Sequence, residues 1–496
     1  MAVRFTDAEV MQSTGASKAH AGKAAAFEGI CTDSRQLTPG CLFVALKGEK
    51  FDAHDFLDQV IAGGAAGVVV SNDYVGSGNA AVYKVGDTLH ALGRLARFHR
   101  DRFKSPLCAV TGSNGKTTTK ELVASILSMR GAALKTYGNL NNEIGVPLTL
   151  FGLERTHVAA VVEMGMNHAG EISRLADIAR PDAGLITIVQ PAHLEGVGSI
   201  EGVANAKGEL FKGLSANATA VVNLDDARVA AQAKGIAART LTYGRAPEAQ
   251  VRLVSVEPQG REGLSLRIAH AGKEHSVALR LVGDHNAMNA TGAFALAIAL
   301  GYQPDECVRG LEAASAHARR LQIVDAPNGV TVVDDCYNAN PASMQAALRT
   351  VQELASSAVE MRPSAPTGSS LLHDAVGADG AHRSGAQETV GRAVAVLGDM
   401  LELGAEETHE HTQLGVIASD RVALLALFGP RMKHAYAQAQ KKLGARVRHF
   451  DDVDALVAWL SHELQPNDFV LVKGSRGMRL ERVVAALTGT QASGGH

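Results

Sequence analysis

The sequence predicts an α/β protein of three domains, and three observations support this fold class. The chain has 496 residues, which is too many for one hydrophobic core. From residue 106 onward, short apolar runs that indicate strands alternate with helical stretches, a pattern typical of a parallel, doubly wound sheet. The same alternation begins again near residue 318. We therefore expect domains at residues 1–104, 105–317 and 318–496.

The composition excludes several classes of protein. The formal net charge of -3 gives no electrostatic case for binding nucleic acid. No apolar run reaches the roughly 18 residues of a membrane span, and the N-terminal residues lack the pattern of a signal peptide. Five scattered cysteines without CxxC spacing favour reduced thiols. We expect a cytoplasmic monomer that binds neither nucleic acid nor membrane.

The elements of the first two domains follow from periodicity. The first domain contains two strand-like runs, GCLFVALKG and AAGVVVS, and then a basic helix, LHALGRLARFHRDRF, before Pro106. The second contains the strands PLCAVTG, HVAAVVEMG, AGLITIVQ and ATAVVNLD, with helices at KELVASILSMRG and IEGVANAKGELFKGL. Alternation over 250–282 indicates antiparallel strands, and HNAMNATGAFALAIALG indicates a long helix. We expect a central domain built on a parallel sheet.

The third domain shows the same pattern. Its strand-like runs are VTVVDD, RAVAVLGDM, RVALLALFG and DFVLVKG, separated by helices such as PASMQAALRTVQEL. This predicts a Rossmann-like α/β domain. Residues 356–389 are rich in Ser, Gly, Ala and His, which indicates a flexible surface insertion.

The stretch TGSNGKTTTKE, which begins at Thr111, ends like a phosphate-binding loop (P-loop). The common G-x-x-x-x-G-K-[ST] spacing requires glycine at position 110, where Val110 stands, so this loop is two residues short. A strand precedes it and a helix follows, so backbone N–H groups and the helix N-terminus would face a phosphate. Lys116 would reach the β- and γ-phosphates and Thr117 would bind Mg²⁺. The alternative is an ordinary strand–helix turn. The candidate nucleotide contacts are Thr111, Gly112, Ser113, Asn114, Gly115, Lys116, Thr117 and Thr118.

Three further residues are candidates for metal chemistry. Glu163 ends a strand beside the loop, where a carboxylate suits a metal, although strand-end glutamates are also often solvated. His193 follows the next strand, and a lone histidine is more often structural than a ligand. Lys207 lies in a helix that returns toward the same edge. If CO₂ adds to its amine, the resulting carbamate is an anion that can bind a second Mg²⁺; the alternative is an exposed helical lysine.

Taken together, these stretches resemble the Mur ligases of bacterial cell-wall synthesis. Besides the short loop, the similar segments include GNLNNEIGVPLT, EMGMNHAGEI, AHLEGVGS, NAKGELF, GDHNAMNA, DDCYNANPASM, GDMLELG and KGSRGMRLE. They extend from CTDSR to KGSRG, which is nearly the whole chain. The resemblance implies a UDP-binding first domain, a central P-loop ATPase domain and a C-terminal Rossmann-like domain. It also implies that the loop is the family's shortened ATP loop rather than a degenerate Walker loop.

For the nucleotide, the resemblance implies that Lys116 and Thr117 bind ATP and that Thr117 and Glu163 bind Mg²⁺. It implies that His193 accompanies a second Mg²⁺ and that Lys207 is carbamylated, so all of Lys116, Lys207 and His193 would serve catalysis. It further implies adenine-side contacts for Asn286 and Asn289, a phosphate contact for Arg320, a ribose contact for Asp335 and a position near the nucleotide for Asn338. The family has glycine before the arginine, where this chain has Arg319.

For the other substrates, the resemblance implies that the first domain binds the UDP group. Hydroxyl, backbone and cationic donors suit uracil and a diphosphate, although a hydrophilic surface loop is the alternative. The implied contacts are Asp33, Ser34, Arg35, Lys47, Gly48, Asp52 and His54. Asn139, Asn141 and Asn142 would line the groove for the muramyl-peptide, or form only a turn. In the third domain Asp399 and Glu402 would receive the ammonium of a dipeptide, and Lys473, Ser475 and Arg476 its carboxylate.

The activity that the resemblance implies is ATP-dependent addition of D-alanyl-D-alanine to UDP-N-acetylmuramoyl-tripeptide (UDP-MurNAc-tripeptide), through an acyl phosphate, with closure of the domains. YNANP favours this reaction over that of a sister ligase adding meso-diaminopimelate, whose Asp-Asn-Pro-Arg box is absent from the sequence. Folylpolyglutamate synthase is another related alternative. A P-loop kinase and a nucleotide-binding regulator are alternatives from other classes. Phosphate release that requires both acceptor and dipeptide would distinguish the ligase.

Overall fold

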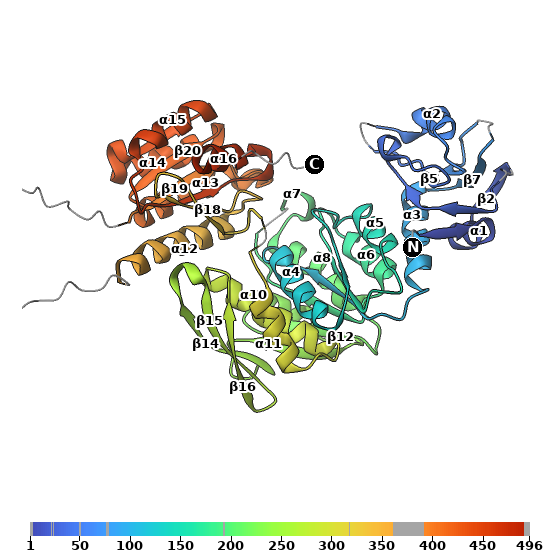
Figure 1. The fold of residues 1–496 in the computed structure, drawn as a ribbon, viewed down its shortest axis with the longest axis horizontal. Coiled ribbons are helices and arrows are strands. Elements are labelled where there is room, and N and C mark those ends of the chain that lie inside the picture. The colour runs from blue at the N-terminus through green and yellow to red at the C-terminus, as the bar shows by residue number, and fades with distance from the viewer. Residues whose placement is uncertain are drawn as a thin grey trace, which may run out of the picture. The chain divides into compact units, whose positions relative to one another are not determined.

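The computed structural model describes residues 3–20, 22, 24–48, 51–75, 79–191, 194–316, 318–360 and 391–490. These residues form an α/β protein (Figure 1). The chain divides into two compact units. The first comprises Met1–Val256, Ser265–Leu279 and Asn286–Ala314, and the second comprises Glu257–Leu264, Arg280–His285 and Ser315–His496.

The first unit begins with a five-stranded sheet in the order β2-β7-β6-β5-β4. Its parallel part consists of β4 (Ile30–Cys31), β5 (Leu42–Val44), β6 (Gly67–Ser71) and β7 (Ala81–Val85), and β2 (Ser17–His20) runs antiparallel at one edge. A separate antiparallel pair joins β1 (Arg4–Thr6) to β3 (Ala26–Glu28). The predicted basic helix is α3 (Thr88–Arg100).

Helix α3 connects this sheet to the next part of the unit, because it packs on α5 (Gly145–Phe151) and α6 (Glu171–Ala179). His99 lies buried in that contact beside the rings of Phe5, Phe103 and Phe151. Its Nε2 donates to the carbonyl of Leu153 at 3.2 Å. Burial lowers the pKa of His99 from 6.5 to about 4, so the imidazole is neutral near pH 7.

A nine-stranded sheet forms the rest of the first unit, with β8 (Leu107–Thr111) near its centre. Strands β10 (Ala159–Glu163) and β11 (Ala183–Ile186) pair with β8 in parallel, and all residues of the three strands are buried. Such two-sided burial explains their nearly continuous apolar sequences. The remaining parallel neighbours are β9 (Ala133–Lys135), β12 (Thr219–Asn223) and β13 (Arg239–Gly244).

The predicted strands over 250–282 lie at one edge of this sheet (Figure 1). They are β14 (Val251–Pro258), β15 (Leu264–His270) and β16 (Lys273–Leu279). The first of them, β14, pairs with β13 in parallel, so the antiparallel pattern expected within 250–282 does not extend to that pair. The helices that bear on the site are α4 (Lys116–Leu127), α8 (Ile200–Lys212), α10 (Asp284–Ala299) and α11 (Pro304–Ala313).

The second unit contains a six-stranded sheet in the order β17-β18-β22-β19-β20-β21. Every neighbouring pair is parallel except β17 with β18. The strands are β17 (Gln322–Asp325), β18 (Thr331–Asp334), β19 (Ala393–Gly398), β20 (Leu424–Phe428), β21 (Val447–Phe450) and β22 (Phe469–Lys473).

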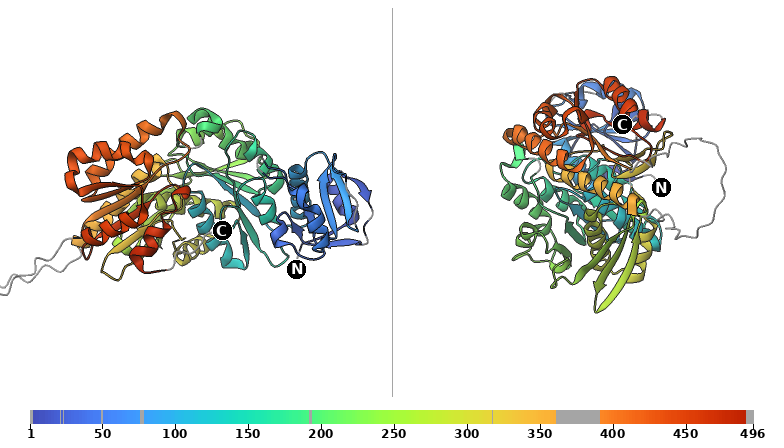
Figure 2. Two further views of the ribbon diagram at one scale, coloured as in Figure 1. Left: turned by 90° about the horizontal axis from the view of Figure 1, so that it is seen from above. Right: turned by 90° about the vertical axis from the view of Figure 1, so that its left-hand side faces the viewer.

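Helices cover both faces of this sheet (Figure 2). One core contains side chains of α12 (Pro341–Glu360), α13 (Glu407–Arg421) and α14 (Lys433–Leu443), and the other those of α15 (Val453–Glu463) and α16 (Glu481–Thr488). Residues 356–360 of the predicted insertion belong to α12, and residues 361–389 lie outside the described part. Within the residues that the structure describes, no helix combines the length and apolarity needed to cross a bilayer.

The buried state of His99 predicts a loss of stability in mild acid. The unfolded chain protonates this residue below pH 6.5, whereas the folded chain resists protonation down to about pH 4. The free energy of unfolding should therefore fall by about 2 kcal/mol between pH 7 and pH 5 from this residue alone. Urea unfolding at the two pH values measures the change. His99→Gln, which keeps a side-chain donor but does not titrate, should decline less; an equal decline would contradict the assignment.

Candidate active site

The predicted phosphate loop joins the end of β8 to the start of α4 and depends on two glycines. Gly112 and Gly115 both have positive φ, at 148° and 79°. A Cβ at Gly112 would lie 1.8 Å from Oγ1 of Thr187, and one at Gly115 would lie 2.3 Å from Oδ1 of Asn289. Only glycine fits at these two positions, because the backbone conformation and the close neighbours both exclude a side chain.

The loop is fastened to the segment that follows β11. The Ser113 hydroxyl donates to the Gln190 carbonyl at 2.8 Å, and the Asn114 amide donates to the Gln190 side chain at 2.6 Å. Thr187 donates from Oγ1 to the Asn114 carbonyl at 2.5 Å. The short loop is thus held from outside by neighbouring residues. Gly115 precedes α4 without supplying a side-chain cap, which suits a helix N-terminus that binds an anion.

Two side chains that are predicted to bind the nucleotide and the metal lie at the head of α4. Lys116 folds back over the loop, and its Nζ donates to the Gly112 carbonyl at 2.8 Å. Thr117 is buried at the first turn. On the far side, Asn289 of α10 accepts from Thr119 at 3.4 Å and donates to Asn286 at 2.9 Å. Of the predicted adenine-side asparagines, Asn289 therefore lies against the loop and its helix, and Asn286 is bonded to Asn289.

Glu163 is the last residue of β10 and pairs in register with Val110 of β8. It therefore lies at the C-terminal end of these strands, where the loop begins. The residue is only 2% exposed. Its Oε1 accepts from Nδ2 of Asn141 at 2.8 Å, whereas Oε2 is buried and has no hydrogen-bond partner among the described residues. A buried carboxylate oxygen without a partner is costly, and a cation would remove that cost. The donors of Glu163 and Thr117 are hard oxygens, which fit Mg²⁺.

Asn141 was expected in the groove for the muramyl-peptide, but its side-chain amide contacts Glu163 instead. Gly165 donates its N–H to the Asn141 carbonyl at 2.7 Å, and a Cβ on Gly165 would meet the Asn141 side chain at 2.9 Å. Asn142 uses its Oδ1 to accept from Gly145 N at 2.9 Å, at the start of α5. Asn139 is exposed.

Lys207 lies on α8 and is 1% exposed, so the alternative of an exposed helical lysine is wrong. Burial, and then the positive charge of Lys116, lower the pKa of Lys207 well below its usual value. Its amine is therefore held toward the neutral form. His193, the other predicted partner of a second metal ion, lies outside the described residues. In the part of the chain that is described, no three His, Cys, Asp or Glu side chains gather as a metal site.

In the second unit, β18 and β22 bring two predicted residues together. Nζ of Lys473 lies 2.6 Å from Oδ2 of Asp335 and donates to the Asn338 carbonyl at 2.9 Å. Lys473 is buried. It was expected to meet the carboxylate of a dipeptide, but the structure pairs it with the carboxylate predicted to hold the ribose. Leu321 N also donates to Asp335, at 3.3 Å.

The turn that carries Arg320 forms although glycine is missing from it. Arg319 has a φ of 63° and Leu321 a φ of 50°, so both adopt the left-handed conformation. The Arg320 guanidinium lies over the Tyr337 ring, 4.1 Å from its centroid. The turn lacks glycine's conformational freedom. It is held instead by the Tyr337 ring and by the ion pair of Arg319 with Glu481 at 3.7 Å.

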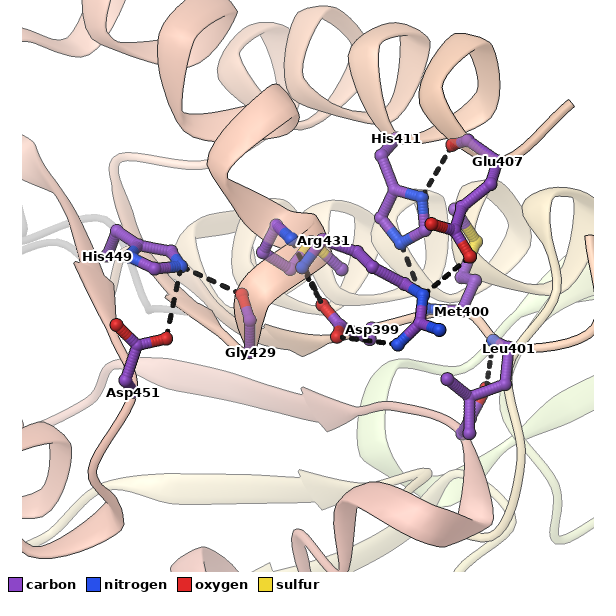
Figure 3. Close-up of polar contacts among 11 residues, drawn as sticks. Asp399, Met400, Leu401, Glu407, His411, Gly429, Arg431, His449 and Asp451 are labelled. Carbon is purple, nitrogen blue, oxygen red and sulfur yellow. Dashed lines mark hydrogen bonds and ion pairs between the residues drawn. The ribbon is translucent and has the colours of Figure 1, made fainter.

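Asp399 has a structural role in this unit (Figure 3). It is fully buried, and its Oδ1 accepts from the backbone N–H groups of Arg431 at 3.1 Å and Met432 at 3.0 Å. Its Oδ2 lies 3.6 Å from the Arg431 guanidinium. Oδ2 accepts no hydrogen bond from the described residues, so the expected role of Asp399 as ammonium receptor stays a prediction.

The segment after Asp399 is held by two residues, one of which the sequence analysis missed (Figure 3). Met400 N donates to Nε2 of buried His411 at 3.1 Å, while Nδ1 of His411 donates to the Glu407 carbonyl at 2.7 Å. Leu401 N donates to Ser475 Oγ at 2.9 Å, so this serine also supports the backbone. Glu402 and Arg476 remain exposed, and Glu402 has a φ of 64°.

In the N-terminal sheet, two predicted groups form local networks. Asp33 accepts from the Arg35 side chain and backbone, and these bonds lower the pKa of Asp33 to about 2. Ser34 begins the turn that follows Asp33. The Asp52 carboxylate lies 2.6 Å from Nδ1 of His54 and 3.2 Å from Nζ of Lys47. The hydrogen bond from the backbone N–H of His54 is the main cause that lowers the pKa of Asp52 to about 2. Gly48 N donates to the Phe51 carbonyl at 2.8 Å.

An exposed aromatic pair next to these residues was also missed. The Phe51 and Phe56 rings are stacked, with centroids 5.3 Å apart and an interplanar angle of 17°. Phe51 is 55% exposed. The spacing of the two phenylalanines around Asp52 and His54 in FDAHDF was the signal that could have revealed the pair.

A parallel α/β sheet that carries a glycine loop at the head of a helix, with a buried carboxylate on the adjacent strand, defines a P-loop nucleotide-binding protein. Family models make the assignment specific. The Mur ligase middle domain matches residues 110–297, the Mur ligase glutamate ligase domain matches 319–361 and 373–476, and the Mur ligase family catalytic domain matches 26–100. The chain belongs to the Mur ligase family.

Individual relatives cover nearly the whole chain. The UDP-N-acetylmuramoyl-tripeptide–D-alanyl-D-alanine ligase of Escherichia coli strain K12 is 37% identical over 93% of each chain. A crystal structure of MurF from Acinetobacter baumannii has a TM-score of 0.84 and 29% identity, over 99% of this chain and 100% of that one. MurF of Thermotoga maritima in complex with ADP has a TM-score of 0.76 and 26% identity, over 93% and 97%. The predicted family and the three-domain α/β fold class are confirmed.

The crowding around the loop predicts a severe effect of Gly112→Ala. The added methyl would displace Thr187, whose hydroxyl holds the Asn114 carbonyl. We expect the free energy of unfolding to fall by about 1–3 kcal/mol and ADP binding to be lost. Urea unfolding and calorimetric titration with ADP measure both. Gly86→Ala is the control, because a Cβ there meets no atom within 4 Å. Normal ADP affinity in Gly112→Ala would mean that the loop does not hold the phosphates.

Proposed function

We propose that this chain is the ATP-dependent ligase that joins D-alanyl-D-alanine to UDP-N-acetylmuramoyl-tripeptide in peptidoglycan synthesis. The Escherichia coli relative bears that name and matches over 93% of both chains. The observation that carries the proposal is the unpartnered, buried Oε2 of Glu163 on the strand next to the phosphate loop. The related MurF structure with ADP supports a nucleotide as the ligand of this fold.

The reaction makes an unreactive carboxylate electrophilic. An oxygen of the tripeptide's terminal carboxylate attacks the γ-phosphorus of ATP, the bond to the β-phosphate oxygen breaks, and ADP leaves. The amine of D-alanyl-D-alanine then attacks the acyl carbon and loses a proton. Phosphate departs and an amide remains. Lys116 and the N-terminus of α4 would stabilise the negative charge on the phosphates during the first step; the position of both at the loop supports this role.

The metal ligands follow from the donor atoms. Thr117 and Glu163 would hold one Mg²⁺, which supplies positive charge beside the transferring phosphoryl group when bound. We propose a second ion held by His193 and a carboxylated Lys207. The lowered pKa of Lys207 supports this, because only the neutral amine has the lone pair that adds to CO₂, with release of a proton.

The other binding residues are assigned by the same reasoning. Asn286 and Asn289 would contact the adenine side of ATP, and Arg320, Asp335 and Asn338 the rest of the nucleotide. The N-terminal residues around Asp33 and Asp52 would bind the UDP group. Glu402 and Arg476 are our candidates for the charged ends of the dipeptide, because both remain exposed. A reaction that consumes ATP and a nucleotide-linked precursor would occur in the cytoplasm of a bacterium.

An omission assay tests the function. Phosphate release is measured with ATP, Mg²⁺, UDP-N-acetylmuramoyl-tripeptide and D-alanyl-D-alanine, leaving out each component in turn. The ligase should release phosphate only in the complete mixture. A kinase would transfer phosphate to the tripeptide even without the dipeptide, and the phosphate would stay on that product. A regulatory protein would neither release nor transfer phosphate. Full release without the dipeptide would rule out the proposed ligase.

Lys116→Ala should lower kcat about 100- to 1000-fold, because the lysine acts on charge that develops on the transferring phosphate. The fold should remain intact, as circular dichroism and thermal melting can verify. Lys212→Ala, an exposed lysine at the end of α8, is the matched control and should keep full activity. Unchanged turnover in Lys116→Ala would remove this mechanism.

Lys207→Ala should have weak activity that a short carboxylic acid, such as formate or acetate, partly restores. The added carboxylate would replace the anionic end of the carbamate in the space left by the shortened side chain. The rescue is measured as kcat against acid concentration, with Lys116→Ala as the control that should not respond. Absence of rescue over a wide concentration range would contradict the carbamate.

A further inference from the structure

Behind Glu163, away from the loop, a buried threonine and a buried lysine link the strand of Glu163 to the helix of the phosphate loop. Thr136 follows β9, and Lys120 lies in the second turn of α4; both are 0% exposed. We propose that Thr136 and Lys120 are positioning residues that fix the carboxylate of Glu163 relative to the phosphate loop. This inference rests on the proposed role of Glu163 in binding Mg²⁺.

Thr136 extends the pairing of β9 with β10 beyond the end of β9. Its backbone N–H donates to the Val161 carbonyl at 3.1 Å. Its Oγ1 then accepts the backbone N–H of Glu163 at 2.9 Å. The hydroxyl of Thr136 thus takes the place of its own carbonyl as the acceptor for Glu163 N, and that carbonyl accepts from Lys120 instead. Removing the hydroxyl would leave a buried backbone N–H without an acceptor at the residue whose side chain is the proposed metal ligand.

Lys120 holds Thr136 from the other side. Its Nζ donates to the Thr136 carbonyl at 2.8 Å and lies 2.7 Å from Oε1 of Glu121. Burial pushes the pKa of Glu121 upward, but the bonds and charges of Lys120 and Lys135 outweigh it, so the pKa lies below its usual value. Glu121 is therefore an ionised partner. Lys135 pairs with the same carboxylate at 2.5 Å but is half exposed.

The consequence concerns geometry at the site. Helix α4 starts at Lys116, and Lys120 lies one turn further along the same helix. The helix that presents its N-terminus to the phosphates is thus bonded, through Lys120 and Thr136, to the backbone of Glu163. A Mg²⁺ ion held by Glu163 beside the phosphates would require both the helix and the carboxylate in fixed positions, because Mg²⁺ tolerates little deviation from octahedral geometry.

The test compares metal-dependent with metal-independent binding of ADP to the full chain. The affinity for ADP is measured by calorimetry without metal and with Mg²⁺, and Mn²⁺ binding in the presence of ADP is measured by electron paramagnetic resonance. Thr136→Val removes the acceptor at nearly constant shape, and Thr136→Ser keeps the hydroxyl. Lys120→Met removes the donor, and Lys135→Met removes only the exposed partner of Glu121.

We expect Thr136→Val and Lys120→Met to bind Mn²⁺ about tenfold more weakly, with metal-free ADP affinity unchanged. Thr136→Ser and Lys135→Met should match the wild type. An equal loss of ADP affinity with and without metal would overturn the inference. So would a lowered melting temperature with unchanged metal binding. If Thr136→Val does not fold, Lys120→Met decides by the same measurement, since Glu121 keeps Lys135 as partner. If the wild type itself shows no increase in ADP affinity on adding Mg²⁺, the proposed function fails rather than this inference alone.

Discussion

The buried carboxylate of Glu163 is the constraint around which the central site is organised. One of its oxygens is satisfied by Asn141 and the other has no hydrogen-bond partner among the described residues. Protein interiors rarely leave such an oxygen without a partner, because the cost of desolvating it is not recovered. Two hydrogen bonds hold Glu163 at the C-terminal end of β10: Asn141 donates to its side chain, and Thr136 accepts from its backbone N–H. A cation at the oxygen without a partner would supply the missing interaction.

The shortened loop imposes a second constraint, which concerns the space around its two glycines. With two residues fewer than the common P-loop spacing, the turn lies close to its neighbours, and Thr187 and Asn289 occupy the space that a side chain at Gly112 or Gly115 would need. Those neighbours also stabilise the loop, since Thr187 bonds the Asn114 carbonyl. A longer loop can enclose phosphates by its own curvature. This one relies on Thr187, directly after β11, and on Asn289 of α10 to keep its shape, so residues far apart in the sequence support one loop.

Much of this could be predicted from sequence, and the failures have a common cause. Apolar runs located β8, β10, β11 and β12 because strands of a parallel sheet are buried on both faces. Motif spacing located the loop and Glu163. Spacing could not assign the partners of polar side chains at the strand ends, because those depend on which strands become neighbours. Lys473 is the last residue of β22 and Asp335 follows β18, and only the sheet order brings them to 2.6 Å. His411 was missed because its role is a bond to a backbone N–H, which leaves no pattern in the sequence.

The second unit shows the same division between residues that touch ligands and residues that hold backbone. Its strand ends carry Asp399, Lys473 and Ser475, yet each of these is buried and bonded within the unit. A buried charge that is already paired, as Lys473 is with Asp335, cannot also discriminate among substrates without first losing its partner, which is expensive in a low-dielectric interior. Under the proposed function, selectivity for the incoming amine would therefore fall to exposed residues of the segments that these groups support. Glu402 meets this condition: its positive φ shows that the backbone is held in an uncommon conformation, and the bonds from Met400 to His411 and from Leu401 to Ser475 supply the restraint just before it.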